Sequence, residues 1–177
     1  MVLKGRAWKF GDDINTNVII QGRYGHLRTN LPELAKHAME DIRPEFAANV
    51  RPGDMVVAGS NMGLGSSREY APLVLKHLEV SAVIAKSFAR IFYRNCINQG
   101  LPAIRVDTDR IHEGDELELD LEQGTLKNQS TQETLAFPQL SKAMAVILRD
   151  GGLVAHVRAH NGLCLPLDDE QGLNASA

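Results

Sequence analysis

Three short apolar runs rich in β-branched residues, separated by two segments of helical periodicity, constrain the fold more than any other feature of this chain. The runs are MVVAG at 55–59, SAVIAKSF at 81–88 and LPAIRV at 101–106. The intervening segments, 71–78 and 89–100, place apolar residues on one helical face. A strand–helix–strand–helix–strand order predicts that the three strands pair in parallel through right-handed crossovers.

The flanking segments extend this unit into a mixed α/β domain. Residues 5–10 predict a first strand, and the spacing of apolar residues from 31 to 42 predicts a helix. Residues 112–137 alternate apolar with polar side chains, which predicts an antiparallel meander with one face toward water. An amphipathic helix is expected at 140–148 and a closing strand at 153–157.

The length and composition favour one ordinary domain. The chain has 177 residues and neither an internal repeat nor a linker, so we expect a domain over residues 1–162 and a polar tail over 163–177. Its formal net charge of -3 and aromatic content of 5% disfavour nucleic-acid binding. The sequence lacks an apolar run of about 18 residues and begins without the apolar stretch of a signal peptide, so a cytoplasmic protein is expected.

Metal-ligating residues are few and scattered. The two cysteines, Cys96 and Cys164, cannot alone build a disulfide framework, a four-cysteine zinc site or an iron–sulfur cluster. His156 and His160 fall in a predicted strand or tail, so no metal site is expected there. We therefore expect the chain to hold no metal by itself, although a partner could hold one. Three other histidines are expected on the surface: His37, His77 and His112.

The glycine-rich segment GLGSSRE at 63–69 is the main candidate for chemistry, because it lies between a predicted strand and a predicted helix. Backbone N–H groups and the helix dipole at such a junction favour an anion, and Arg68 could bind a carboxylate through two hydrogen bonds. The same residues could simply cap the helix, since Ser66 and Glu69 have capping-box spacing. The segment is neither a Walker loop, a dinucleotide fingerprint nor a nucleophile elbow. Pro72, inside the predicted helix, is expected to kink it or remove a hydrogen bond.

Two adjoining segments carry a resemblance to a known family. GSNMGLGSSREYAPLVLK at 59–76 and VSAVIAKSFARIFYRNCINQGLP at 80–102 closely resemble the small subunits of isopropylmalate isomerase and homoaconitase. The same unit is the swivelling C-terminal domain of aconitases. The similarity extends to WKFGDDINTNVII near the start and RDGGL near the end, and covers the chain to about residue 160. The resemblance implies an aconitase swivel-like α/β domain, with three β/β/α layers and a partly parallel sheet.

The resemblance also implies a reaction and a partner. Enzymes of this family dehydrate a hydroxy acid and rehydrate the double bond, which moves the hydroxyl to the neighbouring carbon. A separate large subunit carries a [4Fe-4S] cluster whose open iron binds the substrate as a Lewis acid, and the small subunit closes over the site. We therefore expect a hetero-oligomer in which this chain holds no cofactor and is active only with the large subunit.

Four residues acquire roles from the resemblance. Ser66 matches the serine that acts as catalytic base, and Arg68 and the helix start supply positive potential that lowers its proton affinity. Ser67 and Arg68 match substrate-binding positions. Arg28 falls in the family's specificity loop, where homoaconitase-like members often have arginine for an additional carboxylate and isopropylmalate enzymes tend to have an apolar residue. The alternative for Arg28 is an ordinary solvated loop arginine.

Three positions depart from the family pattern. Asn17 stands where the second aspartate of an Asp-Thr-Asp motif is usual, Leu64 replaces a cysteine, and Tyr70 replaces a histidine. Asn17 keeps the shape and hydrogen bonds of aspartate but loses its charge. These changes indicate a paralogue with altered substrate or proton handling, and weakened catalysis is the alternative. Several motif residues match the family, namely Gly63, Gly65, Ser66, Ser67, Arg68 and Glu69.

The first hypothesis is therefore the small subunit of a heteromeric iron–sulfur hydro-lyase acting on a hydroxy di- or tricarboxylic acid. Within the family, 3-isopropylmalate dehydratase of leucine biosynthesis is the first candidate. Homoaconitase or another malate-derivative dehydratase is the alternative, which Arg28 favours. A non-catalytic paralogue with a binding role is a second alternative, which Asn17 keeps open.

Overall fold

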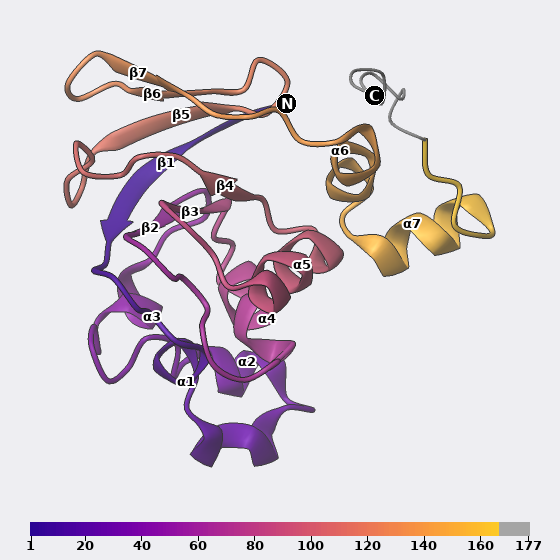
Figure 1. The fold of residues 1–177 in the computed structure, drawn as a ribbon. Coiled ribbons are helices and arrows are strands. Elements are labelled where there is room, and N and C mark those ends of the chain that lie inside the picture. The colour runs from indigo at the N-terminus through magenta and orange to yellow at the C-terminus, as the bar shows by residue number, and fades with distance from the viewer. Residues whose placement is uncertain (167–177) are drawn as a thin grey trace, which may run out of the picture.

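A computed structural model describes residues 1–166 of the chain, which build one mixed seven-stranded sheet with helices (Figure 1). The strand order is β4-β3-β2-β1-β5-β6-β7. The strands are β1 (Val2–Lys9), β2 (Met55–Ala58), β3 (Ala82–Ala85), β4 (Ala103–Arg105), β5 (Glu116–Asp120), β6 (Thr125–Asn128) and β7 (Glu133–Ala136). The helices are α1 (Thr16–Ile19), the 3-10 helix η1 (Gly22–Leu27), α2 (Leu31–Ala35), α3 (Phe46–Asn49), α4 (Tyr70–His77), α5 (Arg90–Gln99), α6 (Lys142–Arg149) and α7 (Leu153–His160).

The parallel half of the sheet confirms the main prediction from the sequence. β2 pairs in parallel with β3, and β3 pairs in parallel with β4, through the crossover helices α4 and α5. All four residues of β2 and all four of β3 are buried. Burial on both faces explains why these strands are continuous apolar runs without alternation.

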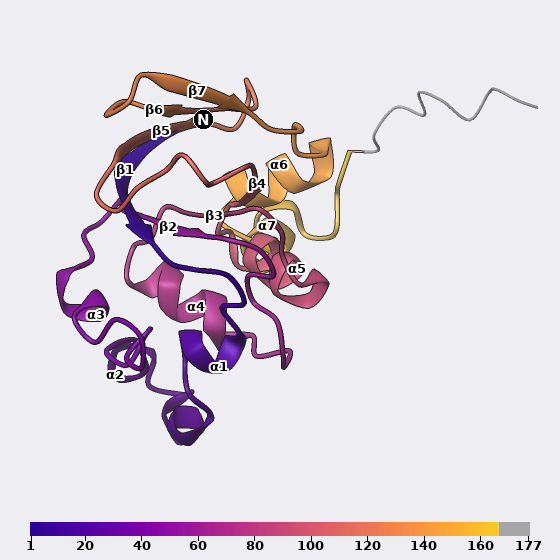
Figure 2. The ribbon, with the colours of Figure 1, turned by 60° about the vertical axis from the view of Figure 1, so that its left-hand side comes forward.

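β1 belongs to both halves of the sheet. Its last residues, Ala7 to Lys9, pair in parallel with β2, whereas Val2 to Arg6 pair antiparallel with β5. β5, β6 and β7 then form the predicted antiparallel meander. The meander lies on one side of β2–β4, while α3 and α4 lie on the other (Figure 2).

Alternate residues of the parallel strands face two separate cores. Val56 and Val83 face the helices and pack with Val74 and Leu75 of α4. The neighbouring residues face the meander and join a second apolar cluster: Met55, Val57, Ala82 and Ile84 with Leu117, Leu119 and Leu126. The three layers are therefore meander, parallel sheet and helices, which confirms the β/β/α architecture.

The predicted closing strand at 153–157 is wrong, because these residues begin helix α7. Gly151 and Gly152, with φ of 84° and 122°, turn the chain after α6, and α7 packs beside α5 and α6 (Figure 1). The side chain of His156 is fully buried. Treating this histidine as polar concealed the helical period of the segment.

Three expectations about other helices are also wrong. The helix predicted over 31–42 is α-helical only from Leu31 to Ala35, and Met39 then adopts a φ of 59°. Pro72 lies in the first turn of α4, where its missing N–H leaves no intrahelical bond unmade, so no kink results. The predicted capping box is not formed, because Glu69 is the N-cap and makes no side-chain cap bond.

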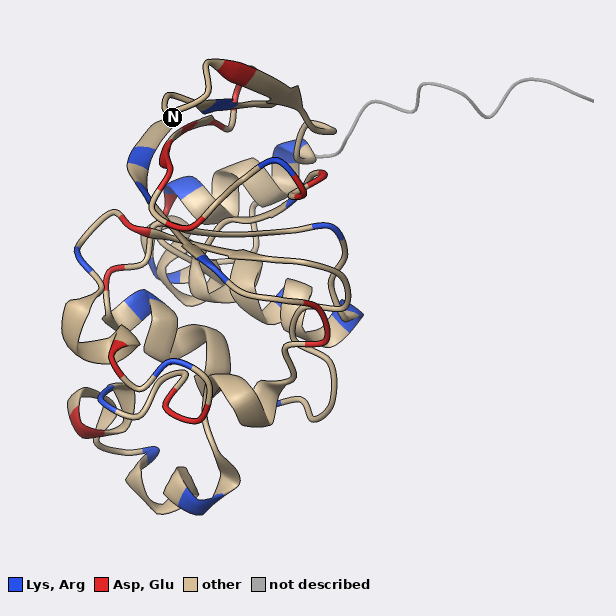
Figure 3. Cartoon of the chain, turned by 90° about the vertical axis from the view of Figure 1, so that its left-hand side faces the viewer, with Lys and Arg blue, Asp and Glu red and all other residues tan. Residues whose placement is uncertain are grey.

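Basic and acidic residues are interspersed along the chain, as the colours of the cartoon in Figure 3 show. Among residues 1–166, none of the helices has both the length and the apolar character needed to cross a membrane. Most of the predicted tail at 163–177 lies outside the described residues.

Candidate functional site

The candidate site lies where two loops leave the same edge of the sheet. β1 and β2 are parallel neighbours, so the chain that follows β1 and the site loop (residues 61–69) that follows β2 emerge together. The backbone joins them directly: Gly63 N–H donates to Ile14 O at 2.6 Å and Thr16 N–H donates to Leu64 O at 2.9 Å. The loop is thereby fixed against the start of α1.

Gly63 permits the close packing of this loop on the helix layer. Its φ is +79°, and a Cβ atom there would lie 2.0 Å from Cγ of Phe92, a buried residue of α5. Gly65, with φ of +99°, has ordinary space around it, its nearest neighbour being Thr16 Oγ1 at 3.5 Å from a built Cβ. Gly63 therefore seats the loop, and Gly65 supplies a left-handed turn.

Ser66, predicted as the catalytic base, is exposed and faces a buried threonine. Its Oγ lies 3.1 Å from Oγ1 of Thr16, and Thr16 also donates to Ser66 O at 3.1 Å. Thr16 is only 2% exposed. A hydrogen bond donated by the Thr16 hydroxyl would stabilise Ser66 Oγ in its deprotonated state. The sequence interpretation missed Thr16, whose one signal was its central place in Asn15-Thr16-Asn17.

Arg68 is oriented by a neutral amide. Its Nη1 donates to Oδ1 of Asn17 at 2.8 Å and to Ile20 O at 3.2 Å. The same Asn17 oxygen accepts from Gly22 N–H at 3.0 Å, so Asn17 links the guanidinium to the first residue of η1. These contacts fix the direction of Arg68 without neutralising its charge. The structure thus brings Asn17, Ser66 and Arg68 together across the two loops.

The segment that contains Arg28 is anchored next to this region. The predicted loop at 22–30 holds η1, and Arg28 is its exposed C-cap. A Cβ atom on Gly25 would lie 3.9 Å from the hydroxyl of Tyr70, at the start of α4. Arg28 is therefore on a segment that passes the site. Its guanidinium is not among the groups that the structure joins to Ser66 or Arg68.

A stacked pair holds η1 to α2 and the turn that follows. The rings of Tyr24 and His37 are parallel within 14° and 3.8 Å apart, and the Tyr24 hydroxyl donates to Glu40 at 2.9 Å. His37 Nδ1 lies 2.6 Å from Glu40, and this hydrogen bond is the main cause that lowers the pKa of Glu40. His37 is consequently half-buried, whereas His77 and His112 are exposed as predicted.

The remaining predicted residues show that the site is open. Gly65, Ser66, Ser67 and Glu69 are all exposed. The site loop therefore forms one wall whose Ser66 side is open to solvent. Cys96 is fully buried, which raises the pKa of its thiol and confirms it as a core residue.

Comparison with known proteins decides the family. The model of the aconitase C-terminal domain matches residues 14–109, more than half of the chain. The chain belongs to the aconitase C-terminal domain family. The matched residues include the site loop together with Thr16 and Asn17.

Relatives within this family include small subunits of two named enzymes. A 3-isopropylmalate dehydratase small subunit 2 of Archaeoglobus fulgidus is 57% identical over 163 residues, covering 92% of this chain and 99% of the relative. A methanogen homoaconitase small subunit of Methanothermobacter thermautotrophicus is 53% identical over 158 residues, covering 88% and 90%.

A solved structure confirms the fold. The crystal structure of a 3-isopropylmalate dehydratase of Methanocaldococcus jannaschii matches with a TM-score of 0.86 and 46% sequence identity, covering 91% of this chain and 96% of that one. The aconitase-family resemblance in the sequence and the swivel-like architecture are therefore both confirmed.

Proposed function

We propose that this chain is the small subunit of a heteromeric hydro-lyase, with 3-isopropylmalate in leucine biosynthesis as the first candidate substrate. The relatives named as dehydratase small subunits support this assignment. The observation that carries it is the pairing across two loops of an exposed serine with a buried threonine, beside an arginine held by a neutral amide. We place the enzyme in the cytoplasm.

Ser66 is the proposed base of the dehydration. Its deprotonated oxygen takes a proton from the carbon next to the hydroxyl-bearing carbon. The electrons of that C–H bond form the C=C bond, and the C–O bond breaks so that the hydroxyl leaves as hydroxide. The single hydroxyl proton of Thr16, which otherwise goes to Ser66 O, turns to Ser66 Oγ while that atom is negative, and the positive charge of Arg68 favours the same state. Rehydration runs these steps backwards, with the hydroxyl added to the neighbouring carbon.

Arg68 is the proposed carboxylate ligand. Nη1 is occupied by Asn17 and Ile20 O, which fixes the plane of the guanidinium and directs its remaining N–H groups. An arginine offers five donors, so two hydrogen bonds to a substrate carboxylate remain available. Ser67, exposed beside it, supplies a further hydroxyl.

The proposed partner is a large subunit that carries a [4Fe-4S] cluster. When bound, such a cluster supplies an open iron that polarises the substrate hydroxyl and carboxylate. The two cysteines of this chain do not form a cluster-binding set, because Cys96 is buried and Cys164 is exposed. The open wall formed by the site loop fits closure against a second subunit.

A homoaconitase-type substrate is the second candidate. Arg28 lies exposed at the end of η1, and one relative carries that name. A guanidinium there would bind an additional carboxylate, whereas an isopropyl group would require an apolar wall.

The test is reconstitution with a cluster-bearing large subunit, followed by dehydration assays. Two substrates are compared, 3-isopropylmalate and its analogue with a carboxylate-bearing side group. We expect Ser66→Ala to lower kcat by about 100-fold or more while substrate binding persists. Ser60→Ala, just before the site loop, should keep wild-type activity.

The possible results distinguish the base assignment, the two candidate substrates and the non-catalytic alternative. Wild-type turnover by Ser66→Ala would remove the base assignment. Faster turnover of the carboxylate-bearing analogue would favour the second candidate. A stable complex that turns over neither substrate would favour the non-catalytic paralogue.

A further inference from the structure

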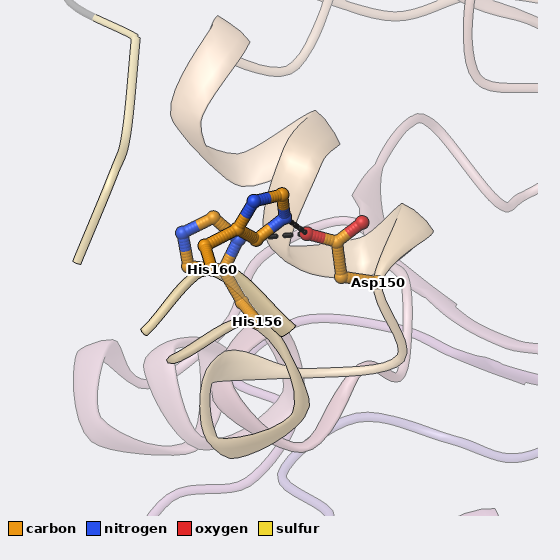
Figure 4. A group of neighbouring side chains, drawn as sticks. All are labelled: Asp150, His156 and His160. Atoms are coloured by element: carbon orange, nitrogen blue, oxygen red, sulfur yellow. Dashed lines mark hydrogen bonds and ion pairs between the residues drawn. The ribbon is translucent and has the colours of Figure 1, made fainter. Parts of the chain in front are cut away.

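Three metal-ligating side chains converge at the junction of α6 and α7 (Figure 4). Asp150 is the C-cap of α6, Gly151 and Gly152 reverse the chain, and His156 and His160 lie one turn apart on α7. Residues four apart share a helix face, so both imidazoles point to the carboxylate of Asp150. None of these residues belongs to the site loop or to the proposed reaction.

One carboxylate oxygen contacts both rings. Oδ2 of Asp150 lies 2.7 Å from Nδ1 of His156 and 3.0 Å from Nε2 of His160. The three ligand atoms lie within 4.8 Å of one another. Arg149 Nε is 3.8 Å from the other oxygen, Oδ1, so Oδ2 is the oxygen that faces the histidines.

The cluster is rigid on one side and accessible on the other. The His156 side chain is 0% exposed and that of Asp150 is 17% exposed, whereas that of His160 is 44% exposed. The turn is tightly seated, since a Cβ atom on Gly152 would lie 2.7 Å from Asn98 O of α5. Two ligands are thus held in place by packing, and the third leaves a path from solvent.

Only one nitrogen of His156, Nδ1, faces the carboxylate of Asp150. Buried imidazoles usually have both nitrogens hydrogen-bonded. The Nε2 atom of His156 is buried and finds no partner within the described part of the chain. Its polar environment is therefore dominated by a single oxygen that it shares with a second imidazole.

We propose that Asp150, His156 and His160 bind a divalent first-row transition-metal ion such as Zn²⁺, which fastens α7 to the end of α6. Two imidazole nitrogens and a carboxylate oxygen are ligands that suit such ions, and three protein ligands leave a fourth position for water. Ligands of a tetrahedral Zn²⁺ at about 2.1 Å lie about 3.4 Å apart. The ion therefore replaces the two hydrogen bonds after Asp150 Oδ2 moves about 0.7 Å further from His156 Nδ1 and about 0.4 Å further from His160 Nε2.

The alternative is a metal-free cap, in which Asp150 merely accepts hydrogen bonds from the two rings. The two states differ in their response to metal. A metal site binds one ion per chain and stabilises the folded state in proportion to metal concentration. A metal-free cap does not respond to metal. Removing one of its side chains would therefore lower the stability by the same amount in EDTA as in zinc.

The experiment uses the untagged full-length chain without any large subunit. Zn²⁺ binding is measured by calorimetry, Co²⁺ binding by visible absorption, and Tm is recorded with EDTA and with zinc at about 100 times its Kd. We expect one ion per chain, a Co²⁺ spectrum typical of tetrahedral geometry, and a Tm increase of about 5–10 °C. His160→Ala removes one ligand, so it should weaken binding by about tenfold or more and cut the Tm increase to about half or less.

Matched variants separate this site from other zinc ligands. His77→Ala removes an exposed histidine of α4, and Cys164→Ser removes the exposed thiol; both should bind zinc as the wild type does. His160→Gln keeps a polar side chain if the alanine variant is unstable, and it should weaken metal binding in the same way. Zinc binding that is absent, or equal in wild type and both His160 variants, would overturn the proposal. Because the assay needs no substrate or partner, its result is independent of the proposed dehydratase activity.

Discussion

The parallel and antiparallel halves of the sheet place their polar side chains differently. β2 and β3 are buried along their whole length, so polar residues collect in the loops at their carboxyl ends. In the meander, β6 alternates half-buried with buried residues, and charged side chains lie along the strands. Burial on both faces therefore concentrates polar groups at one edge of the sheet, where they can meet. A half-solvated sheet spreads its polar groups over a surface.

The largest expected effect tests whether the site loop depends on close packing that the loop before β5 lacks. Gly63→Ala should lower the free energy of unfolding by about 3 kcal/mol or more, because its Cβ meets Phe92 and its φ is left-handed. Gly114→Ala, before β5, has a φ of +82° but open space around the Cβ. It should cost about 1–2 kcal/mol. Urea denaturation measures both.

Equal losses at the two glycines would show that backbone strain alone matters and that the contact with Phe92 relaxes. A larger loss of unfolding free energy in Gly114→Ala than in Gly63→Ala would contradict the claim that the site loop is the more tightly packed of the two. Reconstituted activity should fall with Gly63→Ala and remain with Gly114→Ala.

An intermediate effect tests the hydroxyl pair. Thr16→Val should lower stability by about 1 kcal/mol, because Ser66 O loses its donor. The kcat should fall by more than the loss of folded protein explains, since Ser66 Oγ loses the hydroxyl of Thr16. Thr125→Val in β6 is the matched control, because valine suits a strand equally well. Unchanged kcat in Thr16→Val would remove Thr16 from the mechanism.

The smallest effect concerns an ion pair of the meander side. Lys4 Nζ lies 2.9 Å from Glu118, with the lysine side chain 71% exposed. Lys4→Ala should change the free energy of unfolding by less than about 0.5 kcal/mol and leave activity intact. A loss above about 1 kcal/mol, measured by urea denaturation at low and high salt, would show that this half depends on its surface charges.

The sequence predicted those parts of the fold where one physical signal dominates. Continuous apolar strands and alternating strands differ in period, so both halves of the sheet were predictable. Helix α7 was not, because its inward face carries His156, and burial of a histidine depends on a partner, Asp150, that sequence patterns do not reveal. α2 ends early for a similar reason, since Met39 N–H bonds to Ile19 O across the fold.

The motif in the sequence named most residues of the candidate site, but it did not predict which of their side chains contact one another. Ser66, Arg68 and Asn17 were named from the resemblance to the family, and the structure brings them together. Thr16 was missed because its role follows from the distance between two loops that are far apart in the sequence. The role of Arg28 stays a prediction: it ends a 3-10 helix that passes the site, and an exposed side chain there has no packing to dictate its direction.

The double pairing of β1 also bears on how the chain is made. The strand that becomes the centre of the sheet is synthesised first, yet the partner of Val2 to Arg6 is β5, which emerges only after all four parallel strands are complete. Until then these residues present an open strand edge, the kind of surface that pairs with other chains. A fragment that ends after β4 should therefore aggregate during expression, although it contains every residue of the candidate site.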